Sequence, residues 1–247
     1  MIEFLNHTLT PALFFVFITC FLFAHAFFLK APFLRAARLL RAYGTLTLRT
    51  NLLLYGLFAA GVLTGRLLPD QAHALGTLGA DVVGRIGIHA LTDPVSLAAG
   101  IFVWNFLSGT VLTLWLPGLL FPFFAPLVVA ARFVTVGFML SLASNAVLAL
   151  HVPTILLELQ AYVLMALAGL IALRQLNLPE LMPQLRRLTV TDLLRRRPEA
   201  LQALPLPTRK GLRDQAALLL LAADFLLAGA LYEAYEVHTL IPHLTGH

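Results

Sequence analysis

Long apolar runs, separated by short polar segments, constrain the fold of this chain more than any other feature. Six runs are candidates for membrane helices, and they cover residues 11–29, 50–66, 94–116, 127–150, 154–173 and 215–237. About 20 apolar residues suffice for a helix to cross a bilayer core. Only 12% of the residues are charged, about half the share typical of a soluble domain. The sequence therefore predicts an all-α polytopic membrane bundle of about six transmembrane helices, in a single domain covering residues 1–247.

The positive charges are concentrated in two segments. Residues 30–49 contain five of the 17 Lys and Arg residues, and residues 174–213 contain nine. With six spans, both basic loops fall on the same side of the membrane, which the positive-inside rule makes cytoplasmic. We therefore expect a multi-pass protein of the plasma (inner) membrane with both termini outside. Basic clusters beside apolar runs favour anionic membrane lipid as a partner over nucleic acid.

Prolines and one amphipathic stretch predict local features of the chain. Asp93 is expected to cap the third span, with Pro94 in its first turn. Residues 117–126, PGLLFPFFAP, contain three prolines and predict a short broken or re-entrant turn. Residues 69–91 predict an amphipathic helix on the outer surface. An outer turn is expected at His151, before the fifth span.

Polar side chains occur inside or at the ends of several predicted spans. An ionised side chain at the centre of a membrane helix costs roughly 2.5–3.5 kcal/mol on insertion scales, so such residues normally have partners. We expect an intramembrane polar cluster formed by Asn105, Arg132, Asn145, His151, Glu158, Asp224, Glu233 and Glu236.

The acids of the fifth and last spans are expected to converge in the outer leaflet. Glu158 lies about five residues inside the predicted fifth span, or ~7 Å deep at 1.5 Å per residue. Glu233 and Glu236 are three residues apart near the outer end of the last span, so they share a helix face. His151 and His238 are expected at the same level.

Three uses of these side chains are open. They could lock helices together through polar contacts. They could bind a proton or cation during transport. As a third alternative, His151, Glu158, Glu233 and His238 could ligate a metal that activates water, although no HExxH pattern is present. No cofactor is predicted, and the metal is left open.

Other polar and small residues have their own alternatives. Arg132 is expected to extend to the inner headgroups or to pair with Asp224. Asn105 and Asn145 are expected to make interhelical hydrogen bonds. The Gly61-x-x-x-Gly65 pattern predicts a close-packing face, either within the chain or between copies in a homo-oligomer.

Several of these residues also form an ordered pattern along the chain. In chain order its positions are Asn105, Gly118, Gly137, Glu158-Leu159-Gln160-Ala161, Gly169 and Glu233. Over residues 101–172 and 222–242 this pattern resembles the stage II sporulation protein M family of integral membrane proteins. The chain has Thr154 where that family has a histidine, and Arg132-Phe133 where it has Asn-Gly.

The resemblance implies an integral membrane subunit or scaffold of a cell-envelope complex, without catalysis of its own. Its expected partners are membrane lipid and other membrane or envelope proteins. The alternatives are a transporter or permease-like subunit that uses Glu158 and Asp224 as an ion or proton relay, and an intramembrane metal-dependent hydrolase.

Overall fold

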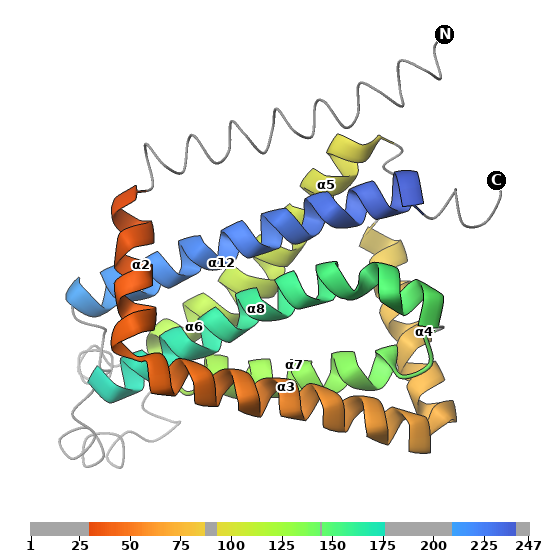
Figure 1. The fold of residues 1–247 in the computed structure, drawn as a ribbon, viewed down its shortest axis with the longest axis horizontal. Coiled ribbons are helices and arrows are strands. Elements are labelled where there is room, and N and C mark those ends of the chain that lie inside the picture. Colours follow the sequence, from red (N-terminus) through yellow and green to blue (C-terminus); the bar gives the residue numbers. More distant parts are fainter. Residues whose placement is uncertain (1–29, 87–92, 144, 176–208, 241–247) are drawn as a thin grey trace, which may run out of the picture.

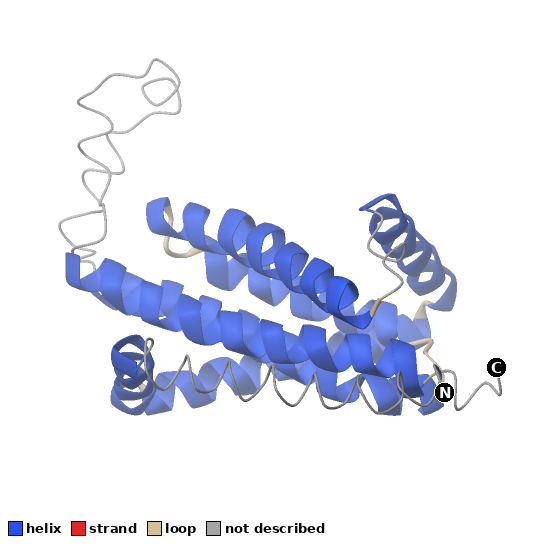
Figure 2. Cartoon of the chain, turned by 90° about the horizontal axis from the view of Figure 1, so that it is seen from above, coloured by secondary structure: helices blue, strands red, loops and turns tan. Residues whose placement is uncertain are grey.

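The computed structural model describes residues 30–86, 93–143, 145–175 and 209–240, and within them every regular element is a helix (Figures 1 and 2). The predicted first span, 11–29, and most of the second basic segment lie outside the described residues. In chain order, the helices are α2 (Lys30–Ala42), α3 (Gly44–Leu67), α4 (Pro69–Ile86), α5 (Pro94–Val103), η2 (Trp104–Trp115), α6 (Leu116–Leu120), α7 (Phe124–Leu140), α8 (Asn145–Gln175), α12 (Arg209–Tyr235) and η3 (Glu236–Leu240).

Four helical stretches among the described residues are long and apolar enough to cross a membrane. They are Gly44–Leu67, Pro94–Leu120, Ala149–Gln175 and Lys210–Leu240. The predicted all-helical membrane bundle is therefore confirmed, whereas the number of six spans is not. The third span begins as expected, because Asp93 accepts a hydrogen bond from the Ser96 backbone N–H at 2.8 Å and Pro94 follows it.

The predicted fourth span, 127–150, is replaced by a shorter helix and a turn. Helix α7 is apolar but ends at Leu140. Its end is closed by Ser141, whose backbone N–H and hydroxyl both donate to the Phe138 carbonyl, at 3.3 and 2.7 Å. Such local side-chain bonds compete with the continuing helix.

Helix α8 begins earlier than the sequence pattern predicts. It starts at Asn145, so His151 and Pro153 lie inside the helix rather than in a turn. Proline fits helical φ values but removes one backbone hydrogen bond. Glu158 is consequently thirteen residues into α8, or ~20 Å along its axis, and not near its end.

The proline-rich break is shorter than the predicted 117–126. Helix α6 continues through Pro117 and Gly118, and the chain leaves helical geometry only at residues 121–123. Pro122 is buried, and its carbonyl lies where a Cβ on Gly169 of α8 would be. The irregular backbone is thus covered by α8, as irregular backbone in a membrane must be.

The bundle is organised around α8, which packs along α12, while α3 packs along α7 (Figure 1). In the most apolar part of Ala149–Gln175, which belongs to α8, 67% of the residues are buried. The corresponding share in α3 is 17%. The Gly61/Gly65 face of α3 is used within the chain, because a Cβ on Gly61 would overlap the Val134 carbonyl of α7. The close-packing face predicted from the two glycines therefore lies against a helix of the same chain.

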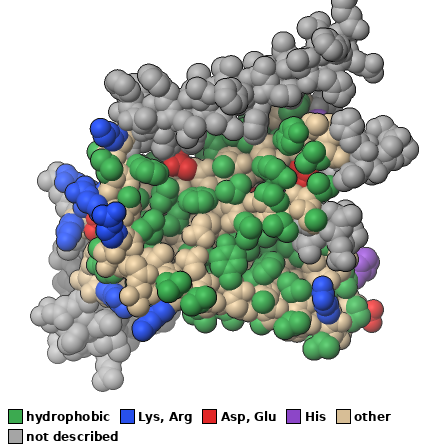
Figure 3. All heavy atoms as spheres, in the orientation of Figure 1, with side chains coloured by type: hydrophobic (Ala, Val, Ile, Leu, Met, Phe, Trp, Pro, Cys, Tyr) green, Lys and Arg blue, Asp and Glu red, His purple; other side chains and the backbone are tan. Residues whose placement is uncertain are grey.

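The two ends of the bundle differ in charge. Helix α2 crosses the end at which α12 begins, and the ion pair between Arg35 and Asp214 ties them together. In Figure 3 the Lys and Arg side chains gather mainly at this edge, and apolar side chains cover the middle of the same face. Helix α4 follows α3 at the opposite end and forms the predicted helix as far as Ile86.

Candidate functional site

Helix α8 carries a stripe of polar residues on one face. His151, Thr154, Glu158 and Tyr162 follow at spacings of three, four and four residues, which places them one above another. Because α8 packs against α12 and η2, Thr154 and Tyr162 of the stripe are buried, whereas His151 and Glu158 are partly buried. From Glu158 to His151 it extends ~10 Å along the helix axis.

Glu158 has one hydrogen-bond partner among the described residues. The Asn105 side-chain amide donates from η2 to Glu158 Oε1 at 2.5 Å. Asn105 was predicted to make an interhelical hydrogen bond, and the structure identifies its acceptor as an acid. A neutral donor satisfies a carboxylate oxygen without supplying a balancing charge.

Asn105 belongs to a π-helix of 12 residues. In a π-helix the backbone hydrogen bonds join residues five apart, and two side-chain hydrogen bonds in this segment have the same spacing. Thr110 Oγ1 donates to the Asn105 carbonyl at 3.0 Å, and Thr113 Oγ1 to the Ser108 carbonyl at 2.6 Å. Such π segments inside α-helices occur frequently at functional sites.

Helix α12 brings a second acid toward Glu158. Gly229 lies against this part of α8, where its Cβ would be 3.5 Å from Glu158 Cγ. Glu233 follows one turn later, and its charge acts on the Glu158 carboxyl together with the charges of Arg132 and His151. The Glu158 carboxyl is thus within electrostatic reach of a second acid on α12.

The stripe ends in a contact between His151 and Glu236. His151 Nδ1 lies 2.9 Å from Glu236 Oε2, and Glu236 is only 2% exposed. Two nearby polar atoms of the same segments, Thr154 Oγ1 and His238 Nε2, are buried and have no hydrogen-bond partner within the described part of the chain. One of the predicted histidines, His151, thus contacts one of the predicted acids, Glu236, while Glu233 acts on Glu158 through its charge.

Arg132 follows neither of its two predicted arrangements. Its guanidinium carbon lies 4.2 Å from the Tyr162 ring centroid, and its Nη1 donates to the Gly109 carbonyl at 3.3 Å. This cation–π contact and hydrogen bond hold Arg132 inside the bundle. Asp224 lies nine residues before Glu233 on α12, ~13 Å along the axis, and is not among the charges that act on Glu158.

One further predicted member of the cluster, Asn145, is the first residue of α8, and its side chain lies outside the described part of the structure. His238, one of the predicted metal candidates, lies in η3, and its Nε2 has no hydrogen-bond partner among the described residues. Across the described ranges, no three His, Cys, Asp or Glu residues are gathered as metal ligands. The four metal candidates are thus divided between separate contacts.

Sequence reasoning missed Thr154 and Tyr162. A usable signal existed, since each is four residues from Glu158 and so on its face. The sequence does not indicate that Gly109 accepts a hydrogen bond from Arg132 or that Gly229 lies against Glu158. Both contacts depend on how closely neighbouring helices approach.

The chain was compared with models of known protein families, with curated proteins and with solved structures, and none of them matches.

Proposed function

We propose that this chain is a multi-pass membrane protein in which Glu158 binds and releases a proton or small cation, as a transporter or permease-like subunit. The observation that carries this proposal is the environment of Glu158. The acid lies in the middle part of a long apolar helix, its hydrogen-bond partner Asn105 is neutral, and the charge of Glu233 acts on it. An ionisable group inside a membrane is a functional candidate by default.

The charge balance around Glu158 supports an exchangeable ligand. The negative charges of Glu158 and Glu233 disfavour each other, and a proton or cation bound at Glu158 would relieve that repulsion. Arg132 acts on Glu158 from a distance, but it is held by Tyr162 and Gly109 and forms no ion pair with that acid among the described residues. A permanent salt bridge therefore does not occupy the carboxylate.

The polar stripe gives the proposed ligand a route. Thr154 lies one turn from Glu158 and His151 lies two turns away, next to buried Glu236. Imidazole and carboxyl groups can pass protons, and buried hydroxyls can complete a cation shell. As part of this proposal, we assign the basic end of the bundle to the cytoplasmic side and the His151 end to the outside.

Flux measurements in proteoliposomes test the proposal. Vesicles containing the wild-type protein should take up protons or monovalent cations down an imposed gradient. Glu158→Gln, which keeps the shape but removes the charge, should lower that flux by roughly tenfold or more, because a mid-membrane acid acts through its ionisation. Asp70→Asn on exposed α4 is the matched acid-to-amide control and should leave flux unchanged.

Ion handling would be refuted if vesicles with the wild-type protein showed the same flux as empty vesicles under pH, Na⁺ and K⁺ gradients. So would equal flux through wild type and Glu158→Gln, provided that both variants insert and retain their helical content.

A second candidate function is a scaffold subunit of a cell-envelope complex. The specific observation in its favour is that polar contacts tie separate helices together: Asn105 with Glu158, His151 with Glu236, and Arg35 with Asp214. The resemblance to stage II sporulation protein M stays a prediction and points the same way. This candidate predicts no flux from any variant, but loss of co-purifying membrane partners when Glu158→Gln loosens the bundle.

A further inference from the structure

A groove opens at the charged end of the bundle, well away from Glu158. It has a volume of about 570 Å³ and lies between α2, the end of α8 and the start of α12. We call it the basic groove. Its lining includes Arg35, Arg38, Gln175, Lys210 and Asp214.

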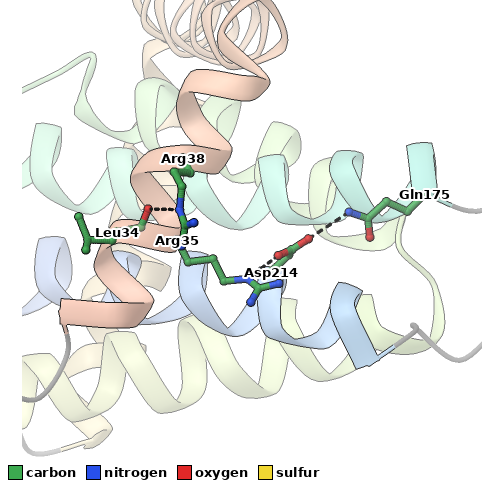
Figure 4. Close-up of polar contacts among 5 residues, drawn as sticks. All are labelled: Leu34, Arg35, Arg38, Gln175 and Asp214. Carbon is green, nitrogen blue, oxygen red and sulfur yellow. Dashed lines mark hydrogen bonds and ion pairs between the residues drawn. The ribbon is translucent and has the colours of Figure 1, made fainter.

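One carboxylate fixes one of the groove's cations in place. Asp214 Oδ1 accepts a hydrogen bond from Arg35 Nε at 2.6 Å, and Asp214 Oδ2 accepts from Gln175 Nε2 at 3.3 Å (Figure 4). The Asp214 side chain is 5% exposed, whereas that of Arg35 is 30% exposed. Both carboxylate oxygens of the buried Asp214 therefore accept hydrogen bonds, and this carboxylate fixes the position of Arg35. The exposed part of the Arg35 guanidinium can contact a ligand in the groove.

The two other cations are not paired with an acid of the described part of the chain. Arg38 Nε donates to the Leu34 carbonyl at 3.2 Å, which orients its guanidinium (Figure 4). Neither Arg38 nor Lys210 forms an ion pair within the described ranges. The described lining residues thus include three cations and one carboxylate, an excess of two positive charges. Guanidinium and ammonium groups placed together in this way suit a phosphate.

The position of the groove points to a lipid phosphate. Helix α2 leads directly into the long apolar helix α3, so the groove lies at the level where a span leaves the hydrocarbon. Phe33 and Leu34 on α2 are each 48% exposed, next to Arg35. Exposed apolar side chains beside cations are typical of a helix that lies in a membrane interface.

We propose that the basic groove binds the phosphate headgroup of an anionic phospholipid. Arg38 and Lys210 contact the phosphate oxygens, and Arg35, positioned by Asp214, supplies the third cation. Free inorganic phosphate offers the same oxygens, so the experiment separates the two sources. The site does not depend on the proposed role of Glu158.

Lipid titration of the full chain in detergent tests this site. Native mass spectrometry would count bound lipids while phosphatidylglycerol, or phosphatidylcholine with the same acyl chains, is added. The wild-type protein should bind one phosphatidylglycerol with clear preference. Each cation near a membrane surface contributes ~1 kcal/mol, so Arg38→Gln and Lys210→Gln should each weaken binding about fivefold. The double variant should weaken it roughly 25-fold.

Arg41→Gln is the matched control, because Arg41 is exposed on the same helix but does not line the groove. It should change the affinity less than twofold. Arg38→Lys keeps the charge and should recover much of the binding, which separates loss of the ligand from misfolding.

Three results would overturn the proposal. The first is equal weakening by Arg38→Gln and Arg41→Gln, which would mean a diffuse surface attraction. The second is equal binding of the two lipids. The third is saturation of the groove by millimolar inorganic phosphate with no lipid preference, which would assign the site to a soluble anion.

Discussion

The contact between α3 and α7 makes two glycines of one helix respond in opposite directions to the same substitution. A Cβ on Gly61 would overlap the Val134 carbonyl, and a Cβ on Gly137 would overlap the Phe58 carbonyl, so the two backbones touch reciprocally. Gly56, also in α3, has no atom within 4 Å of such a Cβ. Alanine therefore has no room at Gly61 and ample room at Gly56.

The expected magnitudes follow from these two environments. Overpacking costs typically ~1–3 kcal/mol, and the obstacle at Gly61 is backbone, which cannot rotate away as a side chain can. Gly56→Ala should instead gain ~0.5–1 kcal/mol from helix propensity. Because 1 kcal/mol shifts the melting temperature of a domain this size by ~2–4 °C, Gly61→Ala should lower it by about 2–12 °C.

Thermal unfolding of the full chain in detergent, followed by circular dichroism, measures both variants. The double variant Gly61→Ala with Gly137→Ala should cost less than the sum of the single changes, since one separation of the helices relieves both overlaps. Melting of Gly61→Ala at or above the temperature of Gly56→Ala would show that α3 and α7 do not make this contact.

Two further substitutions test single polar contacts. Asn105→Leu should destabilise the protein by ~1.5–3 kcal/mol, the usual worth of a hydrogen bond to a charged group. A double-mutant cycle with Glu158→Leu, which removes the acceptor, should give a coupling energy, and a value near zero would contradict the bond. At the start of α5, hydrogen bonds from the Ser96 side chain and then from its backbone N–H hold the pKa of Asp93 below its ordinary 3.8. This contribution is present above pH 3.8 and is lost as the pH falls through the lowered value, so acid titration of unfolding should be flatter in Asp93→Ala than in wild type.

The apolar pattern was enough to predict where most of the described membrane helices lie. The predicted spans 50–66, 94–116 and 215–237 lie within the helical stretches Gly44–Leu67, Pro94–Leu120 and Lys210–Leu240, because these runs are mainly apolar. The start at Asp93 was also readable, since an acid followed by proline is a strong capping signal.

The error around His151 has a physical origin. The predicted fifth span begins at residue 154, which leaves Pro153 before the helix. A proline inside a helix costs one hydrogen bond and some strain, which packing on both sides can offset. Because α8 begins at Asn145, Glu158 lies near the middle of the helix instead of near its start.

Only part of the candidate site could be predicted from the sequence. Helical spacing places Glu233 and Glu236 on one face, but which of them contacts His151 depends on how α8 and α12 are aligned. The π spacing that carries Asn105 has no signature in composition, because it arises from hydrogen bonds to the fifth residue instead of the fourth.

The packing of α12 has a consequence for the synthesis of the protein. This helix contacts α8, α5 and α2, and it supplies Glu233 and Asp214 to the two polar sites. A ribosome reaches it only after the other described helices have been made. Until α12 is made, α8 lacks its main packing partner, and Glu158 is covered only by the helices that precede α12. The bundle can therefore be completed only after α12 has been synthesised. In a chain that ends before residue 209, we expect the face of α8 that carries Glu158 to stay uncovered, so that the chain is degraded.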